Sequence, residues 1–343
     1  MANIFLTRKC NLKCPYCFAD EFVNKEDEEI TLENFKYALD FIKTDKNERI
    51  GFIGGEPLLH PEIGTFLDIV NNDKDIEKVI IYTNGIMIDK YIDKLINEKI
   101  FLLINCNSPK DIGKTNFKKL RENLILLKDK KKTHLTLGIN MYSDKLDYSY
   151  IFDLLELVQR KKVRFSTALP NDSKEHTQNV LESFKEFKPF LFKFFKDCYE
   201  RGIAPFNDCN SMPDCLFSIE DKRLLLQIEQ LGKKSDPPGG LMSSNRTCMP
   251  VIDILPDLKA VRCFGLSKYL KVDIKEFKDI SVLEKYFFNK IDKYAILINE
   301  CDKCEDCMRK ITNKCGICYT YKLNRIEKAK ELIKENINNF EEN

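Results

Sequence analysis

Three cysteines near the start of the chain have a spacing that suits metal binding. Cys10, Cys14 and Cys17 are separated by three and two residues and follow a predicted strand over residues 3–7. Short spacings of this kind let one loop surround an iron–sulfur cubane with several thiolates. Three ligands leave one of four irons open, and an open coordination site distinguishes a reactive metal centre from a structural one. The alternative is a structural zinc loop, but no fourth Cys or His lies near enough in sequence to complete it.

The overall composition indicates that these thiols are kept reduced. The 343 residues include 14 cysteines but only three histidines, so the ligand set is nearly pure sulfur, as suits zinc or iron–sulfur clusters. The start of the chain has no apolar signal segment, and no apolar stretch is long enough to cross a bilayer. A net charge of +2 argues against a nucleic-acid surface. We therefore expect a cytoplasmic protein that contacts neither membrane nor nucleic acid.

The first half of the chain alternates between strand-like and helix-like segments. Six strand–helix repeats imply a parallel sheet with right-handed crossovers, and six are too few to close an eight-stranded barrel. We therefore expect an α/β fold, a six-stranded partial (β/α)6 barrel, with its chemistry at the carboxyl ends of the strands. The expected strands cover residues 3–7, 49–53, 78–82, 100–105, 135–141 and 163–168, and the helices 31–43, 61–71, 89–97, 115–127 and 148–159.

The second half of the chain lacks this regular alternation of strands and helices. Residues 1–172 are expected to form the partial barrel, and residues 173–245 a helical insert and linker with helices over 181–201 and 219–231. The cysteine-dense residues 246–320 are expected to form a separate domain that binds further clusters. Residues 321–343 have the apolar spacing of an amphipathic helix that docks onto the body of the protein.

With these features the chain resembles the radical S-adenosylmethionine (SAM) superfamily. That family has a six-stranded partial barrel with a Cys-x3-Cys-x2-Cys loop directly after the first strand. The resemblance implies that Cys10, Cys14 and Cys17 hold a [4Fe–4S] cluster whose open iron binds SAM. It also implies reductive cleavage of SAM to a 5′-deoxyadenosyl radical, a chemistry that the cofactors supply and the protein positions.

Further residues match positions that contact SAM in this family. Gly54-Gly55-Glu56 follows the second strand, where Glu56 is implied to accept a bond from the methionine ammonium and the glycines to allow close backbone approach. A plain turn is the alternative for this motif and for Thr83-Asn84-Gly85. The catalytic acid or base is unknown. The other implied cofactor contacts are Tyr16, Thr83, Asn105, Asn107 and Ser166; Asn107 stands where many relatives have Asp and so lacks the carboxylate.

A second set of cysteines lies in the last hundred residues. Its two Cys-x2-Cys pairs fit a zinc ribbon, but seven thiols exceed one zinc site by three. The set resembles the SPASM or twitch extension of radical SAM enzymes, which implies one or two auxiliary [4Fe–4S] clusters. The candidate ligands are Cys248, Cys263, Cys301, Cys304, Cys307, Cys315 and Cys318, with Cys209 and Cys215 as additional sources, whereas Cys106 and Cys198 are expected to be ordinary buried thiols.

Relatives with this extension mostly modify peptides or proteins. We therefore predict a peptide maturase that abstracts hydrogen from a residue of a ribosomally made precursor, leading to a crosslink, a thioether or an epimer. Its predicted partners are that peptide and an electron donor such as flavodoxin or ferredoxin. Because the cluster loop begins at residue 10, leader recognition is expected from residues 173–232 or from a separate leader-binding protein. The alternatives are a radical SAM dehydrogenase or mutase of a small molecule, and a zinc-ribbon binding protein.

Overall fold

The chain divides into two compact units, and each is built from two stretches of sequence. The first combines Met1–Leu137 with Pro250–Phe287, and the second combines Gly138–Met249 with Phe288–Asn343. The boundaries at Pro250 and Phe287 fall within residues 246–320, over which the cysteine-rich domain is predicted. The computed structural model describes residues 2–17, 19, 23–24, 28–45, 49–168, 180–207, 209–233, 248, 251–296, 304–305, 307–308, 315, 317–325, 331 and 335.

Four parallel strands form the centre of the first unit. They are β1 (Ala2–Phe5), β2 (Ile50–Ile53), β3 (Val79–Thr83) and β4 (Ile100–Asn105), and they lie side by side in chain order. Every residue of β1 and β2 is buried, as expected of parallel strands that are covered on both faces. The register pairs Phe5 with Ile53 and Thr83 with Ile104, so these strands end at one common edge.

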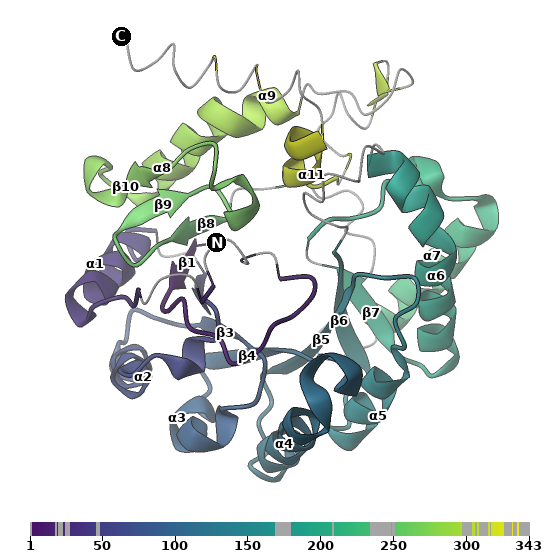
Figure 1. Ribbon diagram of the computed structural model, residues 1–343, viewed down its shortest axis with the longest axis horizontal. Helices are drawn as coiled ribbons and strands as arrows, with labels where there is room; N and C mark the ends of the chain where they lie inside the picture. The colour runs from purple at the N-terminus through teal and green to yellow at the C-terminus, as the bar shows by residue number, and fades with distance from the viewer. Residues whose placement is uncertain are drawn as a thin grey trace. The chain divides into compact units, whose positions relative to one another are not determined.

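The connecting helices lie on the outer side of these strands (Figure 1). They are α1 (Leu32–Ile42), α2 (Ile63–Asn72), the short α3 (Ile92–Leu95) and α4 (Pro109–Asp129). The Thr31 hydroxyl accepts the Asn34 N–H at 3.1 Å and begins α1 as the sequence predicts. Phe35 of α1 stacks on Phe66 of α2, with ring centroids 4.1 Å apart, and this contact joins neighbouring helices over the sheet.

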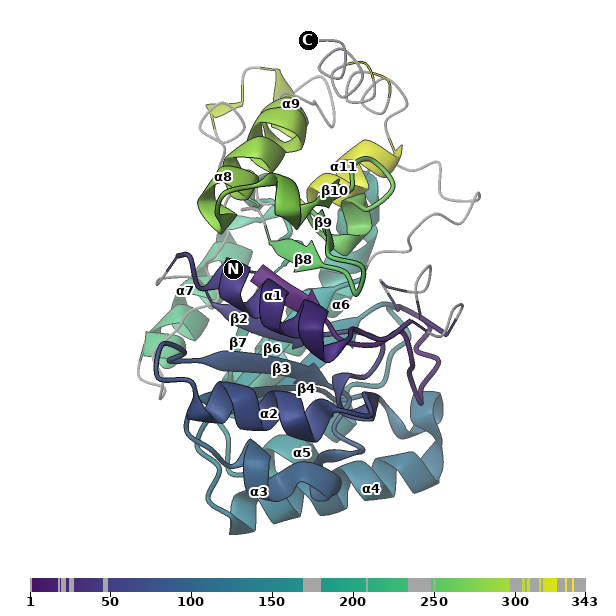
Figure 2. The same ribbon diagram turned by 90° about the vertical axis from the view of Figure 1, so that its left-hand side faces the viewer.

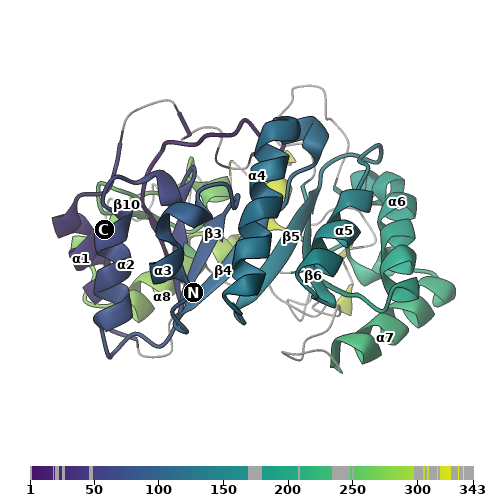
Figure 3. The ribbon, with the colours of Figure 1, turned by 90° about the horizontal axis from the view of Figure 1, so that it is seen from below.

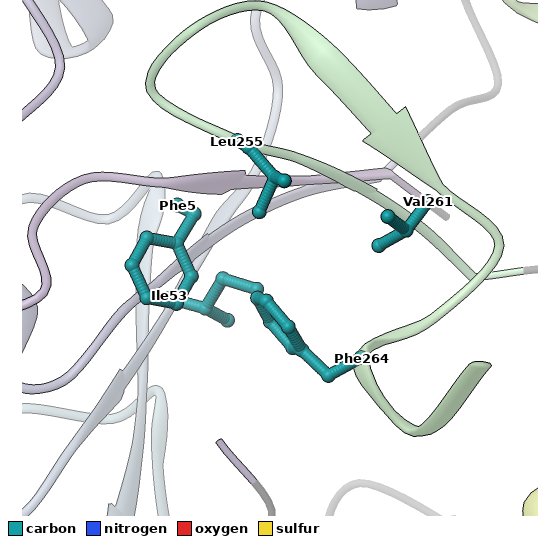
Figure 4. Close-up of a cluster of buried hydrophobic side chains, with 5 residues drawn as sticks. All are labelled: Phe5, Ile53, Leu255, Val261 and Phe264. Atoms are coloured by element: carbon teal, nitrogen blue, oxygen red, sulfur yellow. The ribbon is translucent and has the colours of Figure 1, made fainter. Parts of the chain in front are cut away.

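Strands from far along the chain extend the same sheet beyond β1. β8 (Ile252–Ile254) pairs with β1 in parallel, β9 (Lys259–Val261) pairs antiparallel with β8, and β10 (Val272–Asp273) pairs antiparallel with β9 (Figure 2). A buried apolar cluster seals this junction (Figure 4). Its members are Phe5, Ile53, Leu255, Val261 and Phe264.

A buried polar link also fastens β8 to β1. The Asn3 amide donates to Asp253 Oδ1 at 2.7 Å, and the Phe264 N–H donates to Asp253 Oδ2 at 3.0 Å. Burial raises the pKa of Asp253 to about 7, although these two bonds and the nearby Arg262 charge favour its ionised form. The first strand is thereby held between β2 and a strand about 250 positions later in the sequence.

The second unit is a strand and helix assembly of its own. After β5 (Leu135–Met141), in which the boundary between the units falls, come α5 (Ser149–Leu157), β6 (Lys162–Thr167), α6 (Val180–Glu200), β7 (Ala204–Asn207) and α7 (Ile219–Lys233). β6 pairs with β7 in parallel, and α6 lies beside α7 (Figure 3). The short α9 (Lys293–Ala295) and α11 (Tyr319–Arg325) also belong to this unit, while α8 (Ile280–Phe287) belongs to the first.

The six predicted strands are all present, with ends shifted by up to two residues. The sequence pattern did not predict β7, in which Pro205 interrupts the usual strand pattern, or the short strands β8 to β10. Most of the helix predicted over 321–343 lies outside the described residues. No helix in the described ranges is long and apolar enough to cross a membrane.

Candidate functional site

The polar residues of the first unit gather where its parallel strands end. The loop with Cys10, Cys14 and Cys17 follows β1, Gly54-Gly55-Glu56 follows β2, Thr83-Asn84 closes β3, and Asn105 and Asn107 close β4. Hydrogen bonds join the loops after β1, β2 and β3, so the common edge is a connected polar site. This placement is the one that the sequence predicts for chemistry in a parallel α/β fold.

The cysteine loop lies against an apolar floor. Cys10 and Cys14 pack against a cluster formed by Leu12, Ile86 and Ile112, and all three cysteines are partly buried. Burial raises the pKa of Cys10 to about 11 and that of Cys14 to about 12, and repulsion among the neighbouring thiolates adds to both. The three sulfurs therefore lie close enough together to influence one another's charge.

Two asparagines bind this loop from different sides. The Cys10 N–H donates to Asn24 Oδ1 at 2.9 Å, and Asn24 Nδ2 donates to the Cys10 carbonyl at 3.2 Å. From the end of β3, Asn84 Nδ2 donates to Asn11 Oδ1 at 2.7 Å. Within the loop, the Leu12 N–H points at Cys10 Sγ at 3.5 Å, a contact that stabilises a thiolate.

Glu56 lies completely buried at the centre of the edge. Its Oε1 accepts the Thr83 hydroxyl at 2.6 Å and the Leu58 N–H at 3.2 Å, and its Oε2 accepts the Asn84 N–H at 2.7 Å. Burial raises the pKa of Glu56 to about 7, and these three donors limit the rise. Both predicted site residues, Glu56 and Thr83, thus form one brace between the ends of β2 and β3.

The two glycines before Glu56 permit a close approach between backbone segments. A Cβ on Gly54 would lie 2.6 Å from the Thr7 carbonyl oxygen, and one on Gly55 would lie 2.3 Å from the Lys9 carbonyl oxygen. The Gly55 N–H donates to Thr7 O and the Glu56 N–H to Lys9 O, each at 2.8 Å. The close approach that the motif suggests is therefore made to the strand leading into Cys10.

Tyr16 and Asn107 connect the cysteine loop to the end of β4. The Tyr16 hydroxyl donates to Asn107 Oδ1, and Cys14 lies beside the same hydroxyl, whose hydrogen bond would lower the pKa of that thiol. Asn105 Oδ1 is buried and has no hydrogen-bond partner in the described part of the chain. A buried acceptor without a partner is costly, so Asn105 is the side chain here that a bound polar ligand would satisfy best.

Ser166 lies in the second unit, on β6. Its hydroxyl donates to Asn140 Oδ1, which also accepts the Arg164 guanidinium at 3.0 Å. On the next residue, the Thr167 carbonyl accepts Asn210 Nδ2 at 2.6 Å. This bond fastens the loop between Cys209 and Cys215 to the end of β6.

The cysteines of the second unit fall into two neighbourhoods. Cys209 hydrogen-bonds Cys318, and this bond is the main reason that the pKa of Cys318 is lowered. Burial raises the pKa of Cys215 to about 11, and the charges of three nearby thiolates raise it further. Those neighbours are Cys304, Cys307 and Cys315. Cys209 and Cys215, the two additional candidates, thus each interact with members of the main set.

Fewer contacts are described for the remaining predicted ligands. Cys263 is partly buried in the first unit, directly before the Phe264 N–H that Asp253 accepts, and Cys248 is partly buried in the second. Cys301 lies outside the described residues. Cys106 and Cys198 are buried, as the sequence predicts for ordinary thiols. Among the residues with described positions, no three His, Cys, Asp or Glu side chains are already arranged around a single metal ion.

Three residues that the structure brings into the site were not predicted as site residues. Asn11 lies between Cys10 and Cys14, and Asn84 lies in Thr83-Asn84-Gly85. In both cases a polar side chain within a motif was the sequence feature that could have indicated a site residue. Asn24 belongs to no motif, and no sequence signal could have identified it.

Comparison with known proteins identifies the part of the chain that carries this site. Residues 4–158 match the family model of the radical SAM superfamily. The chain carries a radical SAM domain. That domain contains the cysteine loop and the ends of β1 to β4, so the family assignment and the geometry agree on the same edge.

Similar proteins support the radical SAM fold, a sequence relative over part of the chain and two solved structures over most of it. The S-adenosylmethionine-dependent nucleotide dehydratase RSAD2 of Siniperca chuatsi is 36% identical over 110 residues, which is 31% of this chain and 30% of that protein. The chain thus matches less than a third of that relative's length.

Streptococcus suis SuiB bound to S-adenosylmethionine has a TM-score of 0.63 at 15% identity, over 93% of this chain and 72% of SuiB. The protein anSMEcpe with bound AdoMet and Kp18Cys peptide has a TM-score of 0.62 at 16% identity, over 99% and 100% of the two chains. These likenesses confirm the α/β fold with an open parallel sheet of radical SAM type.

The residues of the radical SAM domain fit a [4Fe–4S] cluster. Three thiols share a partly buried loop over apolar side chains, and a backbone N–H already points at one sulfur. A cluster would draw these thiols into the thiolate form, because a coordinating metal overrides the desolvation that raises their pKa. The unpartnered Asn105 oxygen at the same edge fits a polar cofactor beside the cluster.

Proposed function

We propose that this chain is a radical SAM enzyme that abstracts hydrogen from a residue of a ribosomally made peptide or protein. The observation that carries the radical chemistry is the loop of Cys10, Cys14 and Cys17 at the connected edge of β1 to β4. When bound, the cluster and SAM supply a 5′-deoxyadenosyl radical. The residues of the chain hold the loop, satisfy the cofactor's polar groups and keep the site apolar on one side.

In this proposal some of the predicted site residues position the strand ends and the cysteine loop, and others contact the cofactor. Glu56 and Thr83 brace the strand ends, and Glu56 additionally accepts the cofactor's ammonium. Asn105 offers its free buried oxygen to the cofactor, while Tyr16 and Asn107 fix the far side of the loop. Ser166 stays a proposed cofactor contact.

Two observations support a peptide as the substrate. The fold is similar over most of the chain to SuiB, which has also been solved with its precursor peptide SuiA, and to anSMEcpe with a bound peptide. In addition, the second unit collects Cys209, Cys215, Cys304, Cys307, Cys315 and Cys318, enough sulfur for at least one auxiliary [4Fe–4S] cluster. We propose such clusters, an electron donor such as flavodoxin or ferredoxin, a separate leader-binding protein and a cytoplasmic location.

A nucleotide substrate is the second candidate. It is favoured by the 36% identity to a nucleotide dehydratase over about a third of this chain. This match lies in a segment shorter than the radical SAM domain itself, so it supports the cofactor chemistry more directly than the choice of substrate.

Isotope transfer distinguishes the two substrates. The reduced, reconstituted protein is incubated with SAM and either a perdeuterated peptide encoded beside its gene or deuterated nucleoside triphosphates, and 5′-deoxyadenosine is analysed by mass spectrometry. We expect deuterium from the peptide and none from the nucleotides; transfer from a nucleotide alone would overturn the peptide proposal.

Two cysteine variants test the radical chemistry itself. Alanine at Cys10, Cys14 and Cys17 together should abolish 5′-deoxyadenosine formation. Cys198→Ala, which removes a buried thiol from α6, should leave it unchanged. Equal yields from the triple variant and the wild type would refute a cluster at this loop.

A further inference from the structure

The first cysteine of the cluster loop is held by a side chain that no motif contains. Asn24 contacts the main chain of Cys10 twice, accepting its N–H at 2.9 Å and donating to its carbonyl at 3.2 Å. We propose that Asn24 is a positioning residue for the radical SAM cluster. It acts by fixing the main chain of Cys10, and it touches neither the cluster nor the cofactor.

A primary amide is suited to this task because it offers a donor and an acceptor side by side, as a neighbouring β-strand would. Two bonds to one residue fix the planes of the peptide groups on both sides of its Cα. The direction of the Cα–Cβ bond follows from those planes, so the two Asn24 bonds fix where Cys10 Cβ points and limit Sγ to the rotamers about that bond. A single hydrogen bond would leave rotation about its own axis free.

Asn24 is itself held in place by the strand that leads into the loop. Its N–H donates to the Arg8 carbonyl at 2.9 Å, and its φ of 58° is a left-handed conformation that Asn tolerates better than most residues. Beyond it, Thr7 and Glu29 form an antiparallel bridge, and the Arg8 N–H donates to Glu28 O at 3.1 Å. The described residues of this returning segment therefore line residues 7–10.

Ion pairs reinforce this arrangement. Arg8 pairs with Glu28, and Lys9 Nζ lies 3.0 Å from Glu29 Oε1. On the other side of the loop, Asn84 holds Asn11 by a separate bond of 2.7 Å. Cys10 and Asn11 are thus fixed from two directions by protein groups alone, so the first part of the loop is set before a cluster binds.

Asn24→Gly tests the clamp without disturbing the backbone, because glycine keeps the left-handed conformation and removes both side-chain bonds. Lys131→Gly is the matched control, since Lys131 has φ 54° and is exposed after α4. Loss of a group that orients a metal ligand typically lowers metal affinity about 10- to 100-fold. We expect the SAM-responsive cluster signal of Asn24→Gly, followed by electron paramagnetic resonance, to disappear at least tenfold faster in the presence of an iron chelator.

The same samples distinguish a positioning role of Asn24 from an effect of the substitution on folding. The melting temperature of the cluster-free Asn24→Gly protein should match that of Lys131→Gly, and Asn24→Asp, which keeps only the acceptor, should lose its signal at an intermediate rate. Equal chelation rates for both glycine variants would overturn the proposal, as would a faster loss explained by a lower melting temperature. The inference rests on the radical SAM chemistry proposed above but not on a peptide substrate. The triple cysteine variant tests that chemistry, so the two failures are distinguishable.

Discussion

The buried carboxyl of Glu56 should make the stability of the cluster-free protein depend on pH in a defined direction. Burial raises its pKa from an ordinary 4.5 to about 7, so between these values the folded protein holds a proton that the unfolded chain has lost. The stabilisation from that proton is fully present below pH 4.5 and is lost as the pH rises through about 7. Glu56→Gln removes the titration and preserves the size of the side chain.

The size of the effect follows from the shift in pKa. One pKa unit corresponds to about 1.4 kcal/mol, so the rise to about 7 corresponds to about 3 kcal/mol, of which about 2–3 kcal/mol falls between pH 5 and pH 8. The free energy of unfolding of the wild type minus that of Glu56→Gln should therefore decrease by this amount over that range. Asp253, the other buried carboxyl with a pKa near 7, is present in both proteins and cancels in the difference.

Urea unfolding of the reduced, metal-free protein at pH 5, 6, 7 and 8 measures this difference. Glu77→Gln, on an exposed residue before β3, is the control and should give a difference that stays flat with pH. A flat or increasing difference for Glu56→Gln would mean that the bonds from Thr83, Asn84 and Leu58 keep the carboxylate ionised throughout, and the reasoning from burial would be wrong.

Two further predictions concern the auxiliary thiols and the packing beneath the site. Anaerobic reconstitution should give about 8–12 irons per chain, and replacing Cys304 and Cys315 together should remove about four; an unchanged value near four would refute auxiliary clusters. Gly51→Ala should lower the free energy of unfolding by about 2–3 kcal/mol, because its Cβ would lie 1.9 Å from Asn3 Oδ1 and Asn3 is held by Asp253. Gly64→Ala in α2, whose nearest atom would be 3.9 Å away, should instead raise stability by up to about 1 kcal/mol, and equal effects of the two changes in denaturant melts would contradict this packing.

The alternating strand and helix pattern was sufficient to predict the central sheet. Apolar periodicity located the strands, and Thr31 correctly marked the start of α1. The pattern could not reveal β7, whose four residues include a proline that normally argues against a strand. Nor could it reveal β8, because a three-residue strand gains its stability from β1 and the cluster around Phe264, which are contacts across the whole chain.

In the candidate site, too, the local sequence predicted where the motif residues lie but not which distant side chains hold them. Motif spacing placed Cys10, Glu56 and Thr83 at one edge, because each follows a predicted strand. The partners that hold them depend on side-chain directions that spacing does not encode. The role of Asn24, for example, arises only because a returning segment pairs with residues 7–10.

The pairing of β1 with β8 sets an order of events during synthesis of the protein. Ala2 lies opposite Ile252, so the first strand lacks one of its two neighbours until the ribosome has added about 250 more residues. At about 5–20 residues per second, that interval lasts roughly 12 to 50 s. During it, Phe5 cannot bury itself against Phe264, and the strand that carries the Cys10 loop has an open edge. The edge of β1 beside the Cys10 loop is therefore completed only after residues 252–264 have been synthesised.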